Sequence, residues 1–122
     1  MGTAILLIED NVENRYMTTF LLEKHGYEVL QAVDGPSGIR KARQARPRLI
    51  LLDIQLPGMD GYAIARALRA DPATAAIPIV AMTSYAMAGD REAGLAAGCT
   101  GYIEKPIDPE RFVAEVDRYL AP

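Results

Sequence analysis

Residues 49–54 read Leu-Ile-Leu-Leu-Asp-Ile, an apolar run of strand length that carries one carboxylate, Asp53. A charge at the end of such a run is costly unless a cation or a metal ion lies beside it. Continuous apolar runs of this length are typical of strands buried on both faces of a parallel sheet. Four further short runs are candidate strands, one of them of mixed composition: residues 4–8, 28–32, 79–83 and 101–104.

Amphipathic stretches separate these runs and predict helices. The first carries Tyr16, Met17, Phe20 and Leu21 at helical spacing and ends at Gly26, which suits a C-terminal cap. The predicted helices are residues 14–25, 36–46, 60–70, 88–97 and 109–120. Five strands that alternate with five helices predict an α/β fold with a doubly wound sheet. In such sheets the functional crevice lies at the carboxyl ends of the strands.

Composition limits the function classes that remain. The chain has 122 residues, enough for one domain, with 13 Lys and Arg against 16 Asp and Glu and a net charge of −3. This balance argues against a general nucleic-acid or anionic-membrane binder. The single Cys99 and single His25 rule out an internal disulfide and a zinc site built on Cys or His. No run is long enough to span a membrane and no secretory signal pattern is present, which favours a cytoplasmic location.

Polar side chains follow four of the five predicted strands. Glu9 and Asp10 follow the first, Asp53 ends the third, Thr83 ends the fourth and Lys105 follows the fifth. Because carboxyl ends of parallel strands meet at one edge, these groups are expected to lie together. Taken singly, Thr83 is more often a satisfied strand-end hydroxyl and Lys105 a solvated charge, and Glu9 and Asp10 are as often helix caps as ligands. Asp53 is harder to explain without a cation, and the joint placement of these residues indicates a site.

Three crowded carboxylates repel one another, and a hard divalent cation removes that conflict. Mg²⁺ prefers such oxygen ligands and keeps several waters, so Asp10 and Asp53 are candidate direct ligands and Glu9 a ligand through water. The Lys105 ammonium and the Thr83 hydroxyl add a fixed charge and a donor, which together suit a phosphoryl group. A carboxylate in this set can itself be the nucleophile and form an aspartyl phosphate.

Four motifs carry a resemblance to a known family. They are residues 8–11 (Ile-Glu-Asp-Asn), 52–61 (Leu-Asp-Ile-Gln-Leu-Pro-Gly-Met-Asp-Gly), 82–84 (Met-Thr-Ser) and 102–106 (Tyr-Ile-Glu-Lys-Pro). In this order and spacing, the chain resembles the receiver domain of two-component response regulators, most closely stand-alone receivers of the cell-division type and receiver modules of hybrid histidine kinases. The resemblance covers the whole chain and implies a flavodoxin-like (βα)5 fold. It implies a five-stranded parallel sheet of order 2-1-3-4-5 with helices on both faces.

The resemblance also implies roles for single residues. Asp53 would accept a phosphoryl group from a sensor histidine kinase or a histidine phosphotransfer protein, and the domain would catalyse only its own phosphorylation and dephosphorylation. The Mg²⁺ shell would be formed by Glu9, Asp10, Asp53 and the backbone carbonyl of Gln55. The phosphoryl oxygens would be bound by Thr83, Lys105 and the amides of Ile54 and Ser84. Thr83 and Tyr102 would form the switch, and the peptide bond before Pro106 would be cis. Gln55 and Tyr85 would tune the lifetime of the acyl phosphate.

Phosphorylation is expected to rebias a two-state element, and the surface that reads it out is expected on the fourth helix, fifth strand and fifth helix. That face would carry Tyr85, Tyr102 and Tyr119 and bind a downstream protein partner. Residues 1–122 are expected to form one receiver domain with no output domain. Such a chain either works alone or is a module cut from a hybrid histidine kinase.

Three other functions compete with this interpretation. A phosphohydrolase with an aspartate nucleophile, as in the haloacid-dehalogenase-like family, needs an acid two residues after the nucleophile, where this chain has Gln55. A flavodoxin-like cofactor binder would need a glycine-rich phosphate loop after the first strand, where Glu9 and Asp10 would repel phosphate. A degenerate receiver that only binds proteins would not need the complete acidic set.

Overall fold

The sheet has five parallel strands in the order β2-β1-β3-β4-β5, which confirms the predicted fold class and strand order. The structure is a computed structural model that describes residues 2–56, 58, 60–84 and 88–121, with 88–91 described by their backbone alone. The strands are β1 (Ala4–Ile8), β2 (Glu28–Ala32), β3 (Leu49–Asp53), β4 (Ile79–Thr83) and β5 (Gly101–Glu104). The helices are α1 (Val12–Lys24), α2 (Gly35–Ala45), α3 (Gly61–Ala70), α4 (Ala88–Ala96) and α5 (Pro109–Leu120).

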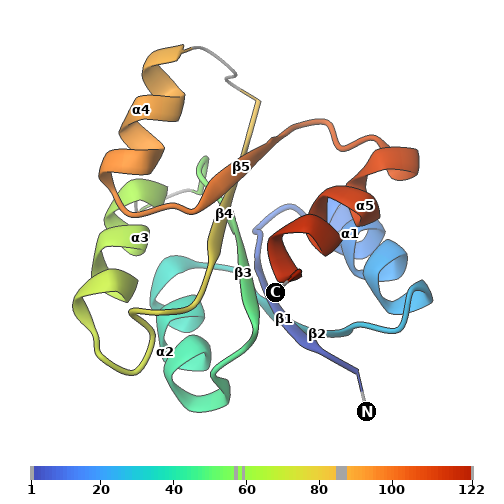
Figure 1. The fold of residues 1–122 in the computed structure, drawn as a ribbon, viewed down its shortest axis with the longest axis horizontal. Helices are drawn as coiled ribbons and strands as arrows, with labels where there is room; N and C mark the ends of the chain where they lie inside the picture. Colours follow the sequence, from blue (N-terminus) through green and yellow to red (C-terminus); the bar gives the residue numbers. More distant parts are fainter. Residues whose placement is uncertain (1, 57, 59, 85–87, 122) are drawn as a thin grey trace.

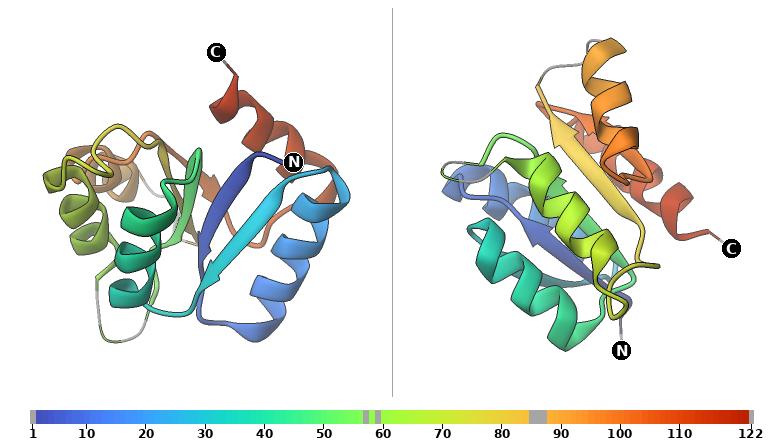
Figure 2. Two further views of the ribbon diagram at one scale, coloured as in Figure 1. Left: turned by 90° about the horizontal axis from the view of Figure 1, so that it is seen from below. Right: turned by 90° about the vertical axis from the view of Figure 1, so that its left-hand side faces the viewer.

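Helices cover both faces of the sheet (Figures 1 and 2). Side chains of a strand alternate between the faces, so β1 sends Ile5 and Leu7 to one core and Leu6 and Ile8 to the other. The first core packs against α1 and α5, and the second against α2 and α3. Every residue of β3 and β4 is buried, as two-sided burial of a parallel sheet requires. None of the described helices combines the length and hydropathy needed to cross a bilayer.

Side chains just before the helices fix where the helices begin. The Asn11 side chain accepts a hydrogen bond of 2.8 Å from the Asn14 amide, so α1 begins at Val12, two residues earlier than predicted. Asp34, Asp60 and Asp108 cap α2, α3 and α5 in the same way. These three carboxylates therefore have a structural role outside the strand-end cluster.

The apolar spacing of α1 marks its buried side only in part, because Met17 and Leu21 pack against the core but Tyr16 and Phe20 do not. Tyr16 is 73 % exposed and Phe20 is 53 % exposed, whereas Thr18 and Leu22 are buried. Apolar residues surround most of this helix, so their spacing alone does not select an inward face. The inward face is decided by Leu22, which packs in the core between α1 and the sheet. Val12, Tyr16 and Phe20 then lie on the exposed side of the helix.

Arg69, near the end of α3, ties together two loops at the amino-terminal end of the sheet. Its guanidinium donates hydrogen bonds to the carbonyls of Gly98 at 2.8 Å, Ala75 at 2.9 Å and Ile77 at 2.6 Å. It also donates to the Thr100 hydroxyl at 3.3 Å. One side chain thus fixes the connections that precede β4 and β5.

Replacing Arg69 with Met should therefore lower the free energy of unfolding by about 2–3 kcal/mol, because several charge-assisted hydrogen bonds are lost together. Chemical denaturation followed by circular dichroism measures this change. Arg66→Met on the exposed side of the same helix is the matched control and should change stability by less than about 0.5 kcal/mol. Equal losses in both variants would contradict the role given to Arg69.

Candidate functional site

The carboxyl ends of β1, β3, β4 and β5 place four polar side chains at one edge of the sheet. Glu9 follows β1, Asp53 ends β3, Thr83 ends β4 and Lys105 follows β5. Glu9, Asp53 and Thr83 are all at most 2 % exposed. The apolar strands below hold the backbone of each residue, so the polar groups are buried at fixed positions. The expected gathering of these residues is observed.

The Lys105 ammonium joins the two buried carboxylates. Its Nζ atom lies 3.2 Å from Glu9 Oε1 and 3.4 Å from Asp53 Oδ2, and its side chain is only 13 % exposed. The Lys105 backbone amide donates to the Thr83 carbonyl at 2.8 Å, which holds the start of this loop against β4. The Lys105–Pro106 peptide bond is cis, as the resemblance implies.

Glu9 has an unusual proton affinity. Burial, and after it the neighbouring Asp53 carboxylate, raise the pKa of the Glu9 carboxyl to about 7, while Lys105 partly opposes them. A carboxyl with this pKa exchanges protons near neutral pH unless added positive charge stabilises its ionised form.

The acidic residues fit a divalent cation. Glu9, Asp10 and Asp53 each offer a carboxylate oxygen, and these oxygens lie within 4.8 Å of one another. Three carboxylates against one ammonium leave two negative charges unbalanced when all are ionised. A cation of charge two with oxygen ligands meets both the charge and the donor set.

Gln55 connects Asp53 to the end of β4. Its backbone amide donates to Asp53 Oδ1 at 2.9 Å, and its side-chain Oε1 accepts from the Ser84 amide at 3.2 Å. The Ile54 amide donates to the Met82 carbonyl at 3.0 Å. Both amides assigned to phosphoryl oxygens by resemblance therefore have protein partners in this structure, and their assignment stays a prediction.

Arg15 is a contributor that the sequence interpretation missed. Its Nη1 atom donates to the carbonyls of Glu9 at 3.1 Å and Asp10 at 3.3 Å, from the first turn and a half of α1. This contact holds the loop that carries the acidic pair. A cation a few residues after two acids was the available signal, but ordinary charge patterning on a helix gives the same spacing.

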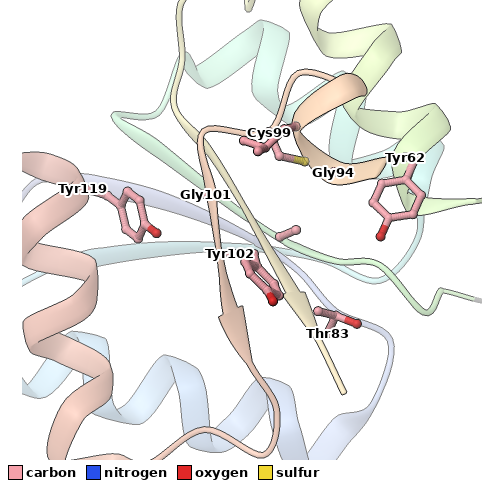
Figure 3. A pocket seen from close by; sticks show the side chains of 9 residues that line it. Tyr62, Thr83, Gly94, Cys99, Gly101, Tyr102 and Tyr119 are labelled. Atoms are coloured by element: carbon pink, nitrogen blue, oxygen red, sulfur yellow. The ribbon is translucent and has the colours of Figure 1, made fainter. Parts of the chain in front are cut away.

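Thr83 and Tyr102 line one cavity beside the site (Figure 3). Tyr102 is half-buried, and Thr83 belongs both to this cavity and to the polar edge. The two switch residues are therefore brought together, while their switching stays a prediction. Tyr85, the second residue expected to tune lifetime, lies outside the described residues.

A model of the response regulator receiver domain matches residues 5–117 of the chain. The polar-differentiation response regulator DivK of Brucella anthropi is 38 % identical over 120 residues, which span 98 % of each chain. The matched length extends through all five strands.

Solved structures show the same likeness. The chemotaxis response regulator CheY4 of Vibrio cholerae matches with a TM-score of 0.93 and 31 % identity, over 98 % of this chain and 100 % of that one. The receiver domain of the sensor histidine kinase PA1611 from Pseudomonas aeruginosa matches with a TM-score of 0.90 and 37 % identity, over 98 % of both chains. That receiver was solved with a magnesium ion coordinated in its active-site cleft.

The raised pKa of Glu9 predicts a specific pH dependence of stability. The folded protein holds the Glu9 proton up to about pH 7, whereas the unfolded chain releases it near 4.5. The resulting stabilisation is complete below pH 4.5 and is lost as the pH rises to about 7. Glu9→Gln should remove this loss and be more stable than the parent by about 2 kcal/mol at pH 8.

Urea denaturation between pH 4.5 and 8, in the presence of a chelator, measures this difference. Glu104→Gln, which replaces an exposed carboxylate at the end of β5, is the control and should follow the parent curve. A Glu9→Gln variant whose stability falls with pH as steeply as that of the parent would refute the explanation.

Proposed function

The chain belongs to the response regulator receiver domain family of two-component signalling, and from that premise we propose that Asp53 is its phosphoacceptor. The donor would be a phosphohistidine on a sensor histidine kinase or a histidine phosphotransfer protein. The observation that carries this proposal is the buried Asp53 carboxylate, held by the Lys105 ammonium on one oxygen and the Gln55 amide on the other. A fixed carboxylate with its charge balanced in this way suits nucleophilic attack on phosphorus.

The transfer is balanced by simple bond exchange. One Asp53 oxygen forms a bond to phosphorus while the phosphorus–nitrogen bond of the donor breaks, and the freed imidazole takes a proton from solvent. Lys105 then lies beside the new phosphoryl group and offsets its negative charge. Thr83, from the adjacent strand, would donate its hydroxyl to a phosphoryl oxygen.

We propose Mg²⁺ as the cofactor, held by Glu9, Asp10, Asp53 and the backbone carbonyl of Gln55. The acidic cluster supports this choice, and so does the magnesium ion in the cleft of the similar PA1611 receiver. Bound there, the ion would supply positive charge that stabilises the negatively charged oxygens of the transferred phosphoryl group.

The two backbone amides would contact the phosphoryl group only after a change of partner. The Ser84 amide would leave Gln55 Oε1, and the Ile54 amide would leave the Met82 carbonyl. Gln55 therefore competes with the phosphoryl group for one donor, which gives a physical reason for its proposed influence on acyl-phosphate lifetime.

We propose that residues 1–122 act as one receiver unit whose signal leaves through a surface. The face of α4, β5 and α5 would bind the downstream partner, because Thr83 and Tyr102 couple the polar edge to the cavity beneath it. Leu95 on α4 is 57 % exposed and offers this face an apolar contact. The domain would catalyse only its own phosphorylation and dephosphorylation.

The exposed row on α1 suits the phosphodonor. Val12, Tyr16 and Phe20 are 68 %, 73 % and 53 % exposed and follow one another at four-residue spacing, so they lie on one side of the helix. The row begins two residues after Asp10, next to the acidic cluster. An apolar helix of the donor packed on this row would bring a phosphohistidine to Asp53.

Replacement of the nucleophile tests the proposed chemistry. Asp53→Asn should abolish labelling by acetyl phosphate in the presence of Mg²⁺, because the amide lacks the carboxylate charge needed for attack. Asp60→Asn is the control, since it keeps the cap of α3 and should label like the parent. Intact protein mass spectrometry measures the added phosphoryl group, and labelling of Asp53→Asn at the parental level would exclude Asp53 as the acceptor.

A second experiment separates docking from chemistry. Tyr16→Asp should slow phosphotransfer from a phosphorylated histidine phosphotransfer protein by about tenfold or more, because it places a charge in a contact worth about 1.4 kcal/mol or more. Labelling by acetyl phosphate, which needs no docking surface, should stay unchanged. Leu95→Asp on α4 is the matched control, and equal slowing in both variants would show that α1 has no special part in docking.

A further inference from the structure

A cavity of about 260 Å³ lies on the α3–α4 side of the sheet, beside β4 and β5. Side chains from five elements line it, so it is part of the fold rather than of one loop (Figure 3). Its principal walls are Tyr62 of α3, Thr83 of β4, Gly94 of α4, Cys99, Tyr102 of β5 and Tyr119 of α5. An engineered cavity of about 150 Å³ holds benzene, so this space is large enough for a small ring compound.

The lining excludes a charged ligand. Every lining residue that the structure describes is an uncharged type at neutral pH, and burial raises the pKa of the Cys99 thiol, which keeps it neutral. An ionic ligand would lose its hydration here without gaining a partner of opposite charge. The hydroxyl groups of the lining residues can still exchange hydrogen bonds with one polar atom of a neutral ligand.

The shape of the lining favours a flat ring. Tyr62, Tyr102 and Tyr119 bring three aromatic side chains to the cavity, and aromatic pairs gain energy beyond the area they bury. Gly94 leaves one wall without a side chain. A Cβ there would lie 3.6 Å from Tyr62 Cε1, so a larger side chain would narrow the space that a ring needs. A Cβ at Gly101 would overlap the Tyr119 ring, so the missing side chain at Gly101 is what lets Tyr119 lie against the cavity.

We propose that this cavity binds a small, uncharged aromatic molecule, and that such binding opposes phosphorylation of the domain. The opposition follows from Thr83, which lines the cavity and also ends β4 beside Asp53. A ligand packed against Thr83 and Tyr102 favours the arrangement described here over any arrangement in which Thr83 turns toward a phosphoryl group. This second part rests on the proposed function, whereas binding itself does not.

Indole is a suitable probe for the binding part, because it is flat, neutral and carries one donor. Titration of the ¹⁵N-labelled protein without metal or phosphodonor should shift the amides of Tyr62, Gly94 and Tyr102, with a dissociation constant on the order of 1 mM for a ligand of this size. Gly94→Leu, which fills the cavity, should weaken binding at least fivefold. Ala93→Leu, on the exposed side of the same helix, is the matched control and should bind like the parent.

Two results would overturn the site: no saturable shift of those amides up to 10 mM indole, on the order of ten times the expected constant, or equal binding by Gly94→Leu and the parent. Thermal denaturation of both variants shows whether they are folded, and Gly94→Ala provides a smaller filling with an intermediate loss of affinity. Leucine and alanine are good helix formers, so α4 tolerates these changes.

The opposition to phosphorylation is measured with beryllofluoride, which imitates the phosphoryl group, in the presence of Mg²⁺. Their addition should weaken indole binding at least fivefold, and indole should weaken beryllofluoride binding by the same factor, because such coupling is reciprocal. Unchanged indole affinity in protein that labels normally with acetyl phosphate would overturn the opposition alone. Protein that binds indole but, in the absence of indole, is not labelled on Asp53 by acetyl phosphate would instead disprove the proposed function.

Discussion

The Lys105 ammonium lies 3.2 Å from Glu9 Oε1 and 3.4 Å from Asp53 Oδ2, and the rest of the site depends on these two contacts. Two carboxylates at most 2 % exposed at neighbouring strand ends would otherwise face each other without a positive charge between them. Lys105 reaches them because its own amide bonds to the Thr83 carbonyl, which fixes the chain as it leaves β5. The charged contacts therefore join the ends of β1, β3, β4 and β5 into one unit.

The apolar sheet makes such burial possible. β3 and β4 are buried along their whole length between two helical layers, and their register pairs Asp53 with Met82, so that Thr83 follows directly where both strands end. The remaining excess of negative charge at this edge fits a divalent cation. Stability of the core and reactivity of the edge thus come from the same strands, with apolar residues below and polar residues at the ends.

Two different environments flank this edge. On one side, α1 exposes an apolar row that starts beside Asp10. On the other side, an uncharged aromatic cavity reaches Thr83 and Tyr102. Thr83 belongs to both the edge and the cavity, and it is the residue through which we propose that the two are coupled. Gln55 provides a second connection, because it contacts Asp53 with its amide and the Ser84 amide with its side chain.

The sequence alone determined the strands and helices, because two-sided burial leaves a clear apolar pattern. It determined the strand order through a family resemblance. It also determined that Glu9, Asp10, Asp53, Thr83 and Lys105 lie together, because the carboxyl ends of parallel strands share one edge. It did not determine which side of α1 faces the core, since Tyr16 and Phe20 have the same spacing as core residues and only packing of Leu22 decides between them. The loop-holding contacts of Arg15 and Arg69 and the cavity beside Thr83 were likewise decided by tertiary structure. Each depends on groups far apart in the chain, and no local pattern encodes the distance between them.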